Sequence, residues 1–189
     1  EDKQDAMLKH EYARSALKLG LRHEQELGVN PFKFGLIGST DGHNSVSTTE
    51  EDNFFGKFPD SQPGKKRLDN QMAGVLWQNW RIVASGYAAA WARENTREAL
   101  FEAFKRREVY ATTGSRIQVR FFGGWNYQAS DIDRPSYLDI AYSGGVPMGG
   151  DLLQAPENKA PSFMVVAAKD PDGANLDRVQ IIKGWLQQD

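Results

Sequence analysis

The spacing of apolar residues changes near Ser115, and this change constrains the fold of the 189-residue chain more than any other feature. Before Ser115 the clearest pattern is helical, because residues 95–107 begin with a capping pattern, carry one apolar stripe and end in a basic run. After it, apolar residues alternate every second position, as in Ile117-x-Val119-x-Phe121. Such alternation is typical of antiparallel sheets with one face on a core. The sequence therefore predicts a mixed α+β chain.

Residues 115–189 are predicted to form an antiparallel β-sandwich-like domain. The alternation recurs at three further places, which we interpret as strands: Leu138-x-Ile140-x-Tyr142, Phe163-x-Val165 and Val179-x-Ile181. About four strands are fewer than a stable sandwich usually has. We therefore expect this domain to be incomplete or to pair with another chain, since an exposed sheet edge favours pairing.

Residues 1–114 are predicted to alternate helices with extended segments. A surface helix over about 4–27 should end near Gly28, because Asn30-Pro31 cannot continue it. Residues 33–38 then have the apolar character of a strand buried in a parallel sheet. Residues 88–91 are assigned to one or two helical turns.

The charge balance and the absence of cysteine limit the functions open to the chain. It carries 23 basic and 25 acidic side chains, so nucleic acid is not an expected partner. Without cysteine, a metal must be held by histidine and carboxylate groups, and the compartment is either the bacterial cytoplasm or the periplasm. No apolar run is long enough to span a membrane. The first residues resemble neither a signal peptide nor a chain start, so we expect a longer parent protein.

The residue group with the clearest chemistry is Ser39-Thr40-Asp41-Gly42-His43-Asn44, directly after the predicted strand. Two positions separate Asp41 from His43, so both side chains can face one cation, and their oxygen and nitrogen donors suit zinc, manganese or iron. Asn44 could orient a metal ligand or the substrate without binding the metal itself. The alternative is a plain turn in which Asp41 binds its own backbone and His43 is exposed. Two ligands do not complete a site that needs at least three, so spacing leaves both interpretations open.

Other candidates have simpler structural explanations. His10 and His23 lack the four-residue spacing of paired helical ligands. Residues 170–173 (DPDG) share only a superficial pattern with a calcium loop, and a turn is favoured. Three tryptophans could line a sugar or base platform, but apolar neighbours favour packing: Trp77, Trp80 and Trp91.

Four segments resemble a bacterial domain-of-unknown-function family, number 3604, allied to the PHP (polymerase and histidinol phosphatase) superfamily. They are residues 30–43 (NPFKFGLIGSTDGH), 51–57 (EDNFFGK), 91–99 (WARENTREA) and 106–117 (RREVYATTGSRI). PHP proteins are distorted β/α barrels whose metal cluster hydrolyses phosphoesters. The resemblance implies that residues 1–114 are the C-terminal remnant of such a barrel and that residues 115–189 form the sandwich-like domain after it.

The last metal motif of PHP proteins is an Asp-x-His at a strand end, which Asp41 and His43 match. The resemblance implies that these two residues are metal ligands. Ser39, Thr40 and Asn44 would then either support those ligands or contact the substrate. The opening His-x-His and the middle Glu and His ligands have no counterpart here. The chain is then the C-terminal part of a metal-dependent hydrolase acting on a small molecule or phosphoester, and by itself it is expected to be inactive.

The rival hypothesis is a non-catalytic β-sandwich binding or interaction module in which the Asp-Gly-His turn is a degenerate metal motif. Under both hypotheses the expected partners are a second copy of the chain or the missing part of the protein. The sequence assigns no catalytic residue in either case.

Overall fold

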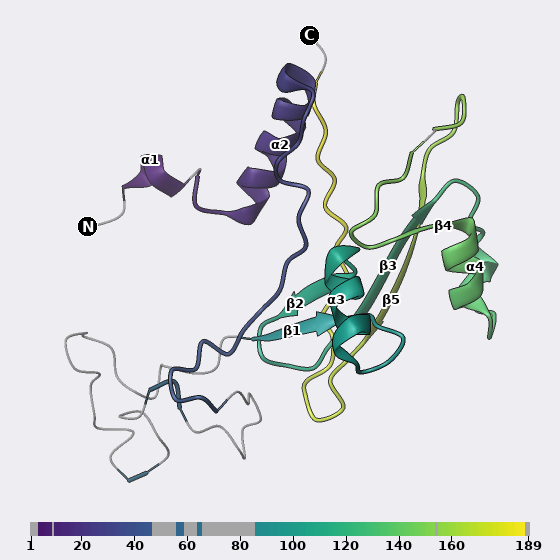
Figure 1. Ribbon diagram of the computed structural model, residues 1–189. Coiled ribbons are helices and arrows are strands. Elements are labelled where there is room, and N and C mark those ends of the chain that lie inside the picture. Colours follow the sequence, from purple (N-terminus) through teal and green to yellow (C-terminus); the bar gives the residue numbers. More distant parts are fainter. Residues whose placement is uncertain are drawn as a thin grey trace. The chain divides into compact units, whose positions relative to one another are not determined.

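The computed structural model describes residues 4–8, 10–46, 56–58, 64–65, 86–153 and 155–187. The chain divides into two compact units, one formed by Glu1–Phe34 with Arg178–Asp189 and the other by Gly35–Asp177. Figure 1 labels their helices and strands. This division into units does not test the predicted domain boundary after residue 114, which stays a prediction.

The first unit contains two helices, α1 (Asp5–Leu8) and α2 (Ala13–Leu27). The single helix predicted over residues 4–27 is therefore wrong, because Tyr12 before α2 is extended, with φ −109° and ψ 138°. The predicted end at Gly28 is confirmed. Gly28 adopts a left-handed conformation, with φ 75°, and its N–H donates to the Glu24 carbonyl.

The end of the chain in this unit differs from its predicted structure. Val179-x-Ile181 was expected to be a strand, yet no strand or helix is present over residues 178–187. Val179 and Ile181 are both exposed. Alternation becomes a strand only where a second strand accepts its hydrogen bonds, and no described segment does so here. The strand prediction at this position is therefore wrong.

In the second unit, β1 (Tyr87–Ala90) pairs antiparallel with β2 (Val109–Thr112), and α3 (Arg97–Lys105) connects them. Figure 1 shows α3 next to this two-stranded sheet. The predicted helix is confirmed, and the Thr96 hydroxyl caps it by accepting the Ala99 N–H at 3.3 Å. The helical turns predicted over residues 88–91 are wrong. Alanine favours helices locally, but the pairing of β1 with β2 overrides that preference.

The buried strand predicted over residues 33–38 is also absent, and Leu36 and Ile37 are exposed. The backbone nevertheless passes very close to the β1–β2 sheet at Gly38. A Cβ atom there would lie 2.5 Å from the Tyr87 carbonyl oxygen and 3.0 Å from that of Thr112. Gly86 is as tightly placed, since its Cβ would lie 2.0 Å from the same Thr112 oxygen. Only glycine fits at these two positions.

The second sheet has the order β4-β3-β5, with every pair antiparallel. Its strands are β3 (Gln118–Gly124), β4 (Gly145–Pro147) and β5 (Ser162–Ala168), of which β3 and β5 confirm the alternation predicted there. Phe122 and Met164 on one face pack against Ala141 in a small core. On the sheet, the Phe121 and Phe163 rings stack with centroids 5.4 Å apart.

Helix α4 (Tyr137–Gly144) replaces the strand predicted at Leu138-x-Ile140-x-Tyr142. Figure 1 shows it beside β4. Leu138, Ala141 and Tyr142 are also spaced as one face of a helix, and that face packs on the sheet: Ala141 is fully buried, and Tyr142 meets the Phe122 ring edge-on at 5.0 Å. The described fold is thus mixed, with helices and two small antiparallel sheets, neither of them closed. None of its described helices could cross a membrane.

Glu108 connects most elements of this unit although its side chain is charged and the residue is only 3% exposed. Its carboxylate accepts a hydrogen bond from the Tyr142 hydroxyl and lies 3.3 Å from the Arg106 guanidinium. Arg120 in β3 donates to the same Tyr142 hydroxyl at 3.2 Å and stacks over the Trp91 ring at 3.6 Å. Burial and the neighbouring carboxylate raise the pKa of Tyr142. The buried charge is thus paired and hydrogen-bonded.

Residues 170–173 form the predicted turn, in which the Gly173 N–H donates to the Asp170 carbonyl at 3.1 Å. The Asp170 carboxylate accepts the N–H of Arg116 at 2.5 Å and that of Asp172 at 3.1 Å. These backbone donors, that of Arg116 first, lower the pKa of Asp170. The carboxylate thus ties the turn to the chain just before β3.

We expect Asp170→Asn to lower the free energy of unfolding near pH 7, because the amide accepts fewer and weaker hydrogen bonds. The Asp170 pKa is lower in the folded chain, so its contribution is present above the unfolded pKa and is lost as the pH falls through the folded pKa. Urea unfolding at a series of pH values should show the two proteins converging in acid. A difference that is constant with pH would contradict this explanation.

Replacement of Gly145 by alanine should destabilise the second sheet by about 1 to 3 kcal/mol through overpacking. A Cβ atom there would lie 2.1 Å from the Gly123 carbonyl oxygen and 2.3 Å from the Tyr127 hydroxyl. Gly123→Ala is the matched control, because its Cβ would be 3.4 Å from the nearest atom, in the Phe163 ring. Chemical denaturation should separate the two variants, and equal stabilities would refute the steric argument.

Candidate functional site

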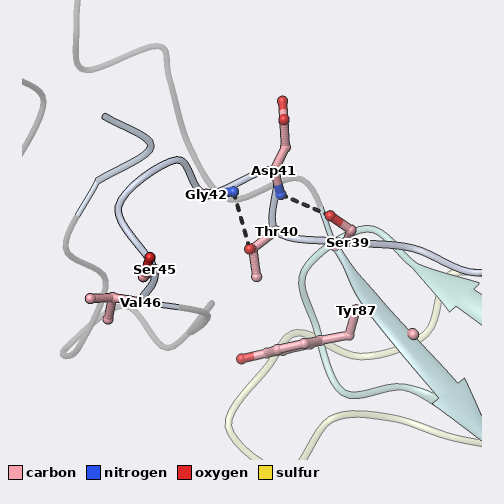
Figure 2. Close-up of a pocket in the computed structure, with 9 residues that line it drawn as sticks. Ser39, Thr40, Asp41, Gly42, Ser45, Val46 and Tyr87 are labelled. Carbon is pink, nitrogen blue, oxygen red and sulfur yellow. Dashed lines mark hydrogen bonds between the residues drawn. The ribbon is translucent and has the colours of Figure 1, made fainter. Parts of the chain in front are cut away.

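The loop of residues 39–46 is shaped by short polar side chains that bond its own backbone. Ser39 Oγ accepts the Asp41 N–H at 3.1 Å, and Thr40 Oγ1 accepts the Gly42 N–H at 3.2 Å. Figure 2 shows both bonds. Asp41 itself has a left-handed backbone, with φ 54°, which aspartate tolerates better than most residues. Ser39 and Thr40 thus fix the loop.

Asp41 and His43 lie together, as their spacing predicts. His43 Nε2 is 3.1 Å from Asp41 Oδ1, and the other carboxylate oxygen, Oδ2, is 2.6 Å from Lys57 Nζ. The Lys57 carbonyl also accepts the His43 N–H at 2.7 Å. Lys57 therefore contacts both residues of the motif, one through its side chain and the other through its backbone.

Asn44 holds the loop to residues 56–58. Its amide Nδ2 donates to the Gly56 carbonyl at 2.6 Å, and its Oδ1 accepts the Val46 N–H at 3.0 Å. The His43 ring packs against Phe58, with ring centroids 4.4 Å apart. The loop is thus attached to residues 56–58 by two hydrogen bonds from its own atoms and by one ring contact.

The pKa of Asp41 is lowered, first by the hydrogen bond from Lys57 and then by the one from His43. Both partners favour the ionised carboxylate. Asp41 is therefore an anion at neutral pH, which is the form that binds a cation.

A pocket of about 560 Å³ opens beside the loop. In Figure 2 the Tyr87 ring lies below Thr40, while the Asp41 side chain points away from that ring. Among the described residues that line the pocket, only Asp41 has a charged side chain, and His43 does not line it. Ser39, Thr40, Ser45 and Tyr87 are the lining residues with a hydroxyl group. The lining residues are Ser39, Thr40, Asp41, Gly42, Ser45, Val46, Gly86, Tyr87 and Ala88.

Asp41 and His43 could supply two ligands to one divalent cation, although their contact is equally that of a hydrogen bond. Donors at bond lengths of about 2.1 Å lie about 3.0 to 3.4 Å apart around a six- or four-coordinate metal. The observed separation of 3.1 Å falls in this range. Over the residues that the structure describes, no group of three histidine or acidic side chains converges on one point.

The remaining sequence candidates lie elsewhere. His10 is in the turn before α2, and the His23 ring lies 6.2 Å from the Phe32 ring. Trp91 packs under Arg120 and donates from Nε1 to the Val119 carbonyl at 2.8 Å, as a packing role predicts. Trp77 and Trp80 fall outside the described residues.

Sequence reasoning alone missed Lys57 and Tyr87 as neighbours of the motif. Lys57 lies fourteen positions after His43, and no spacing rule joins a lysine at that distance to an Asp-x-His pair. The signal that could have identified it is its place in the segment EDNFFGK, which carries the family resemblance. Tyr87 carries no such signal, because it lines the pocket only through the pairing of β1 with β2.

A family model described as "Protein of unknown function (DUF3604)" matches residues 1–189. Comparison with curated proteins and with solved structures gave no match.

We expect Asn44→Ala to loosen the loop, because the Asn44 side chain makes two hydrogen bonds, one to the Gly56 carbonyl and one from the Val46 N–H. The Val46 amide should exchange with solvent about 5- to 30-fold faster, which corresponds to a net loss of about 1 to 2 kcal/mol. Hydrogen exchange followed by NMR measures this directly. Asn175→Ala, at an exposed position outside the loop, serves as the control. Unchanged exchange at Val46 would show that Asn44 does not hold the loop.

Proposed function

We propose that this chain, which belongs to the DUF3604 family, is the C-terminal part of a metal-dependent hydrolase of phosphoesterase type. In this proposal Asp41 and His43 are the last metal-binding motif, and the remaining ligands lie in the longer parent protein. The substrate is a small molecule or phosphoester.

The observation that carries the proposal is the placement of the Asp41 carboxylate and the His43 imidazole. Their donor atoms are 3.1 Å apart, and both residues are more than half exposed, so a cation can reach them. Asp41 is ionised at neutral pH, because Lys57 and His43 stabilise its charged form. One anionic oxygen and one nitrogen donor suit zinc, manganese or iron.

A divalent metal held there would supply Lewis-acid chemistry, which makes water more acidic and offsets negative charge on substrate oxygens. The residues of this chain have supporting roles. Asp41 and His43 hold the metal, while Asn44, through Gly56 and Val46, keeps the loop in position. Ser39 and Thr40 face the pocket and fix the backbone that carries Asp41.

The family resemblance extends the proposal to the rest of the chain. Residues 1–114 would be the end of a PHP-like β/α barrel in a bacterial protein, and residues 115–189 an accessory sandwich-like domain. By itself the chain would be inactive.

A second candidate function is a non-catalytic binding or interaction module with a degenerate metal motif. It is favoured by one observation: within the described ranges, no third acidic or histidine side chain joins Asp41 and His43. In that case the pocket beside Tyr87 would bind a ligand without converting it.

Metal content and phosphoesterase activity of the full-length parent distinguish the two functions. We expect Asp41→Ala and His43→Ala each to lower bound zinc or manganese, with a fall in turnover of about 100-fold or more. Asn175→Ala, at an exposed position outside the pocket, is a suitable control. If neither motif variant changes bound metal or turnover, the hydrolase assignment at this site is wrong.

A further inference from the structure

We propose that Lys57 is the resident cation of Asp41: its ammonium group pairs with the carboxylate while the metal is absent and is displaced as the metal binds. Lys57 would then set the metal affinity of the site. The inference rests on the proposed function, because it concerns the same carboxylate.

The contacts of Asp41 show that both carboxylate oxygens are already engaged. Oδ1 is 3.1 Å from His43 Nε2, and Oδ2 is 2.6 Å from Lys57 Nζ. An Nζ–oxygen distance of this length is typical of a strong, charge-assisted hydrogen bond. A divalent cation that binds Oδ2 therefore competes with the ammonium group for one atom, and a cation held between Oδ1 and His43 Nε2 competes with it for the negative charge of the same carboxylate.

Burial distinguishes this ion pair from an ordinary surface pair. The Lys57 side chain is only 17% exposed, whereas the Asp41 side chain is 56% exposed. The Lys57 side chain is thus largely shielded from water, whereas the Asp41 side chain remains accessible to solvent. A metal can arrive from solvent while Lys57 still holds the carboxylate, and exchange of one cation for the other needs no empty intermediate.

The Lys57 side chain can move without releasing the loop, because backbone groups around Lys57 hold the loop in place. The Lys57 carbonyl accepts the His43 N–H, and the neighbouring Gly56 carbonyl accepts the Asn44 amide. Neither bond involves the lysine side chain. Four flexible methylene groups let the ammonium move away while the backbone of residues 56–58 keeps the loop in place.

The proposal predicts that removal of the ammonium strengthens metal binding. Loss of one charge-assisted competitor should raise the zinc or manganese affinity of Lys57→Met by about tenfold or more. Lys57→Arg keeps a cation at the carboxylate and should stay much closer to the wild-type affinity. Lys105→Met is the matched control, because Lys105 also pairs with an acid, Glu102, but at 4.0 Å on the exposed surface of α3.

Isothermal titration of the full-length parent with zinc or manganese, alongside an Asp41→Ala variant, tests the proposal. Tighter binding by Lys57→Met, with Lys105→Met unchanged, supports it. Equal or weaker binding by Lys57→Met, while Asp41→Ala abolishes binding, overturns the role of Lys57 and leaves the metal site intact. If Asp41→Ala does not alter metal binding, the proposed metal site fails and the Lys57 proposal fails with it.

A second measurement does not depend on a variant that must fold. In the wild-type protein the side-chain ammonium resonance of Lys57 should shift when zinc is added, while the exchange rate of the His43 amide stays the same. An unmoved Lys57 resonance at saturating zinc would show that the ammonium does not leave, and would overturn the proposal.

Discussion

The second unit depends on the charge of Glu108 being kept inside the protein. A buried carboxylate is costly unless it is paired, and here Arg106 and Tyr142 satisfy it. These partners come from the end of α3 and from α4, while Arg120 connects the group to β3. Through these contacts one carboxylate joins the β1–α3–β2 segment to α4 and to the three-stranded sheet. The loop of the candidate site approaches the same β1–β2 sheet at Gly38.

In the candidate site, one set of side chains determines the course of the loop and another set carries the charge. Hydroxyl and amide groups of Ser39, Thr40 and Asn44 bond the backbone and determine the course of the loop. The charged groups Asp41 and Lys57 pair with each other, and Asp41 also contacts His43.

Local patterns predicted those elements whose hydrogen bonds or caps are local. The helix starting at Thr96 and the end of α2 at Gly28 follow from capping chemistry. Where the outcome depended on a distant partner, the pattern misled: β1 is a strand because β2 lies beside it, and α4 is a helix because its face fits the sheet. The pairing of Asp41 with His43 was likewise predictable from spacing. Lys57 was not, because only the folded loop brings it to Asp41.

Two glycines determine where the loop of the candidate site lies. Gly38 and Gly86 carry no functional group, yet each lies against a backbone carbonyl of the β1–β2 pair with no room for a methyl group. If the proposed function holds, a random mutational screen for lost activity of the parent protein would return Gly38 and Gly86 beside Asp41 and His43. In related sequences, an alanine at either position would indicate a displaced loop even where every polar residue of the motif is retained.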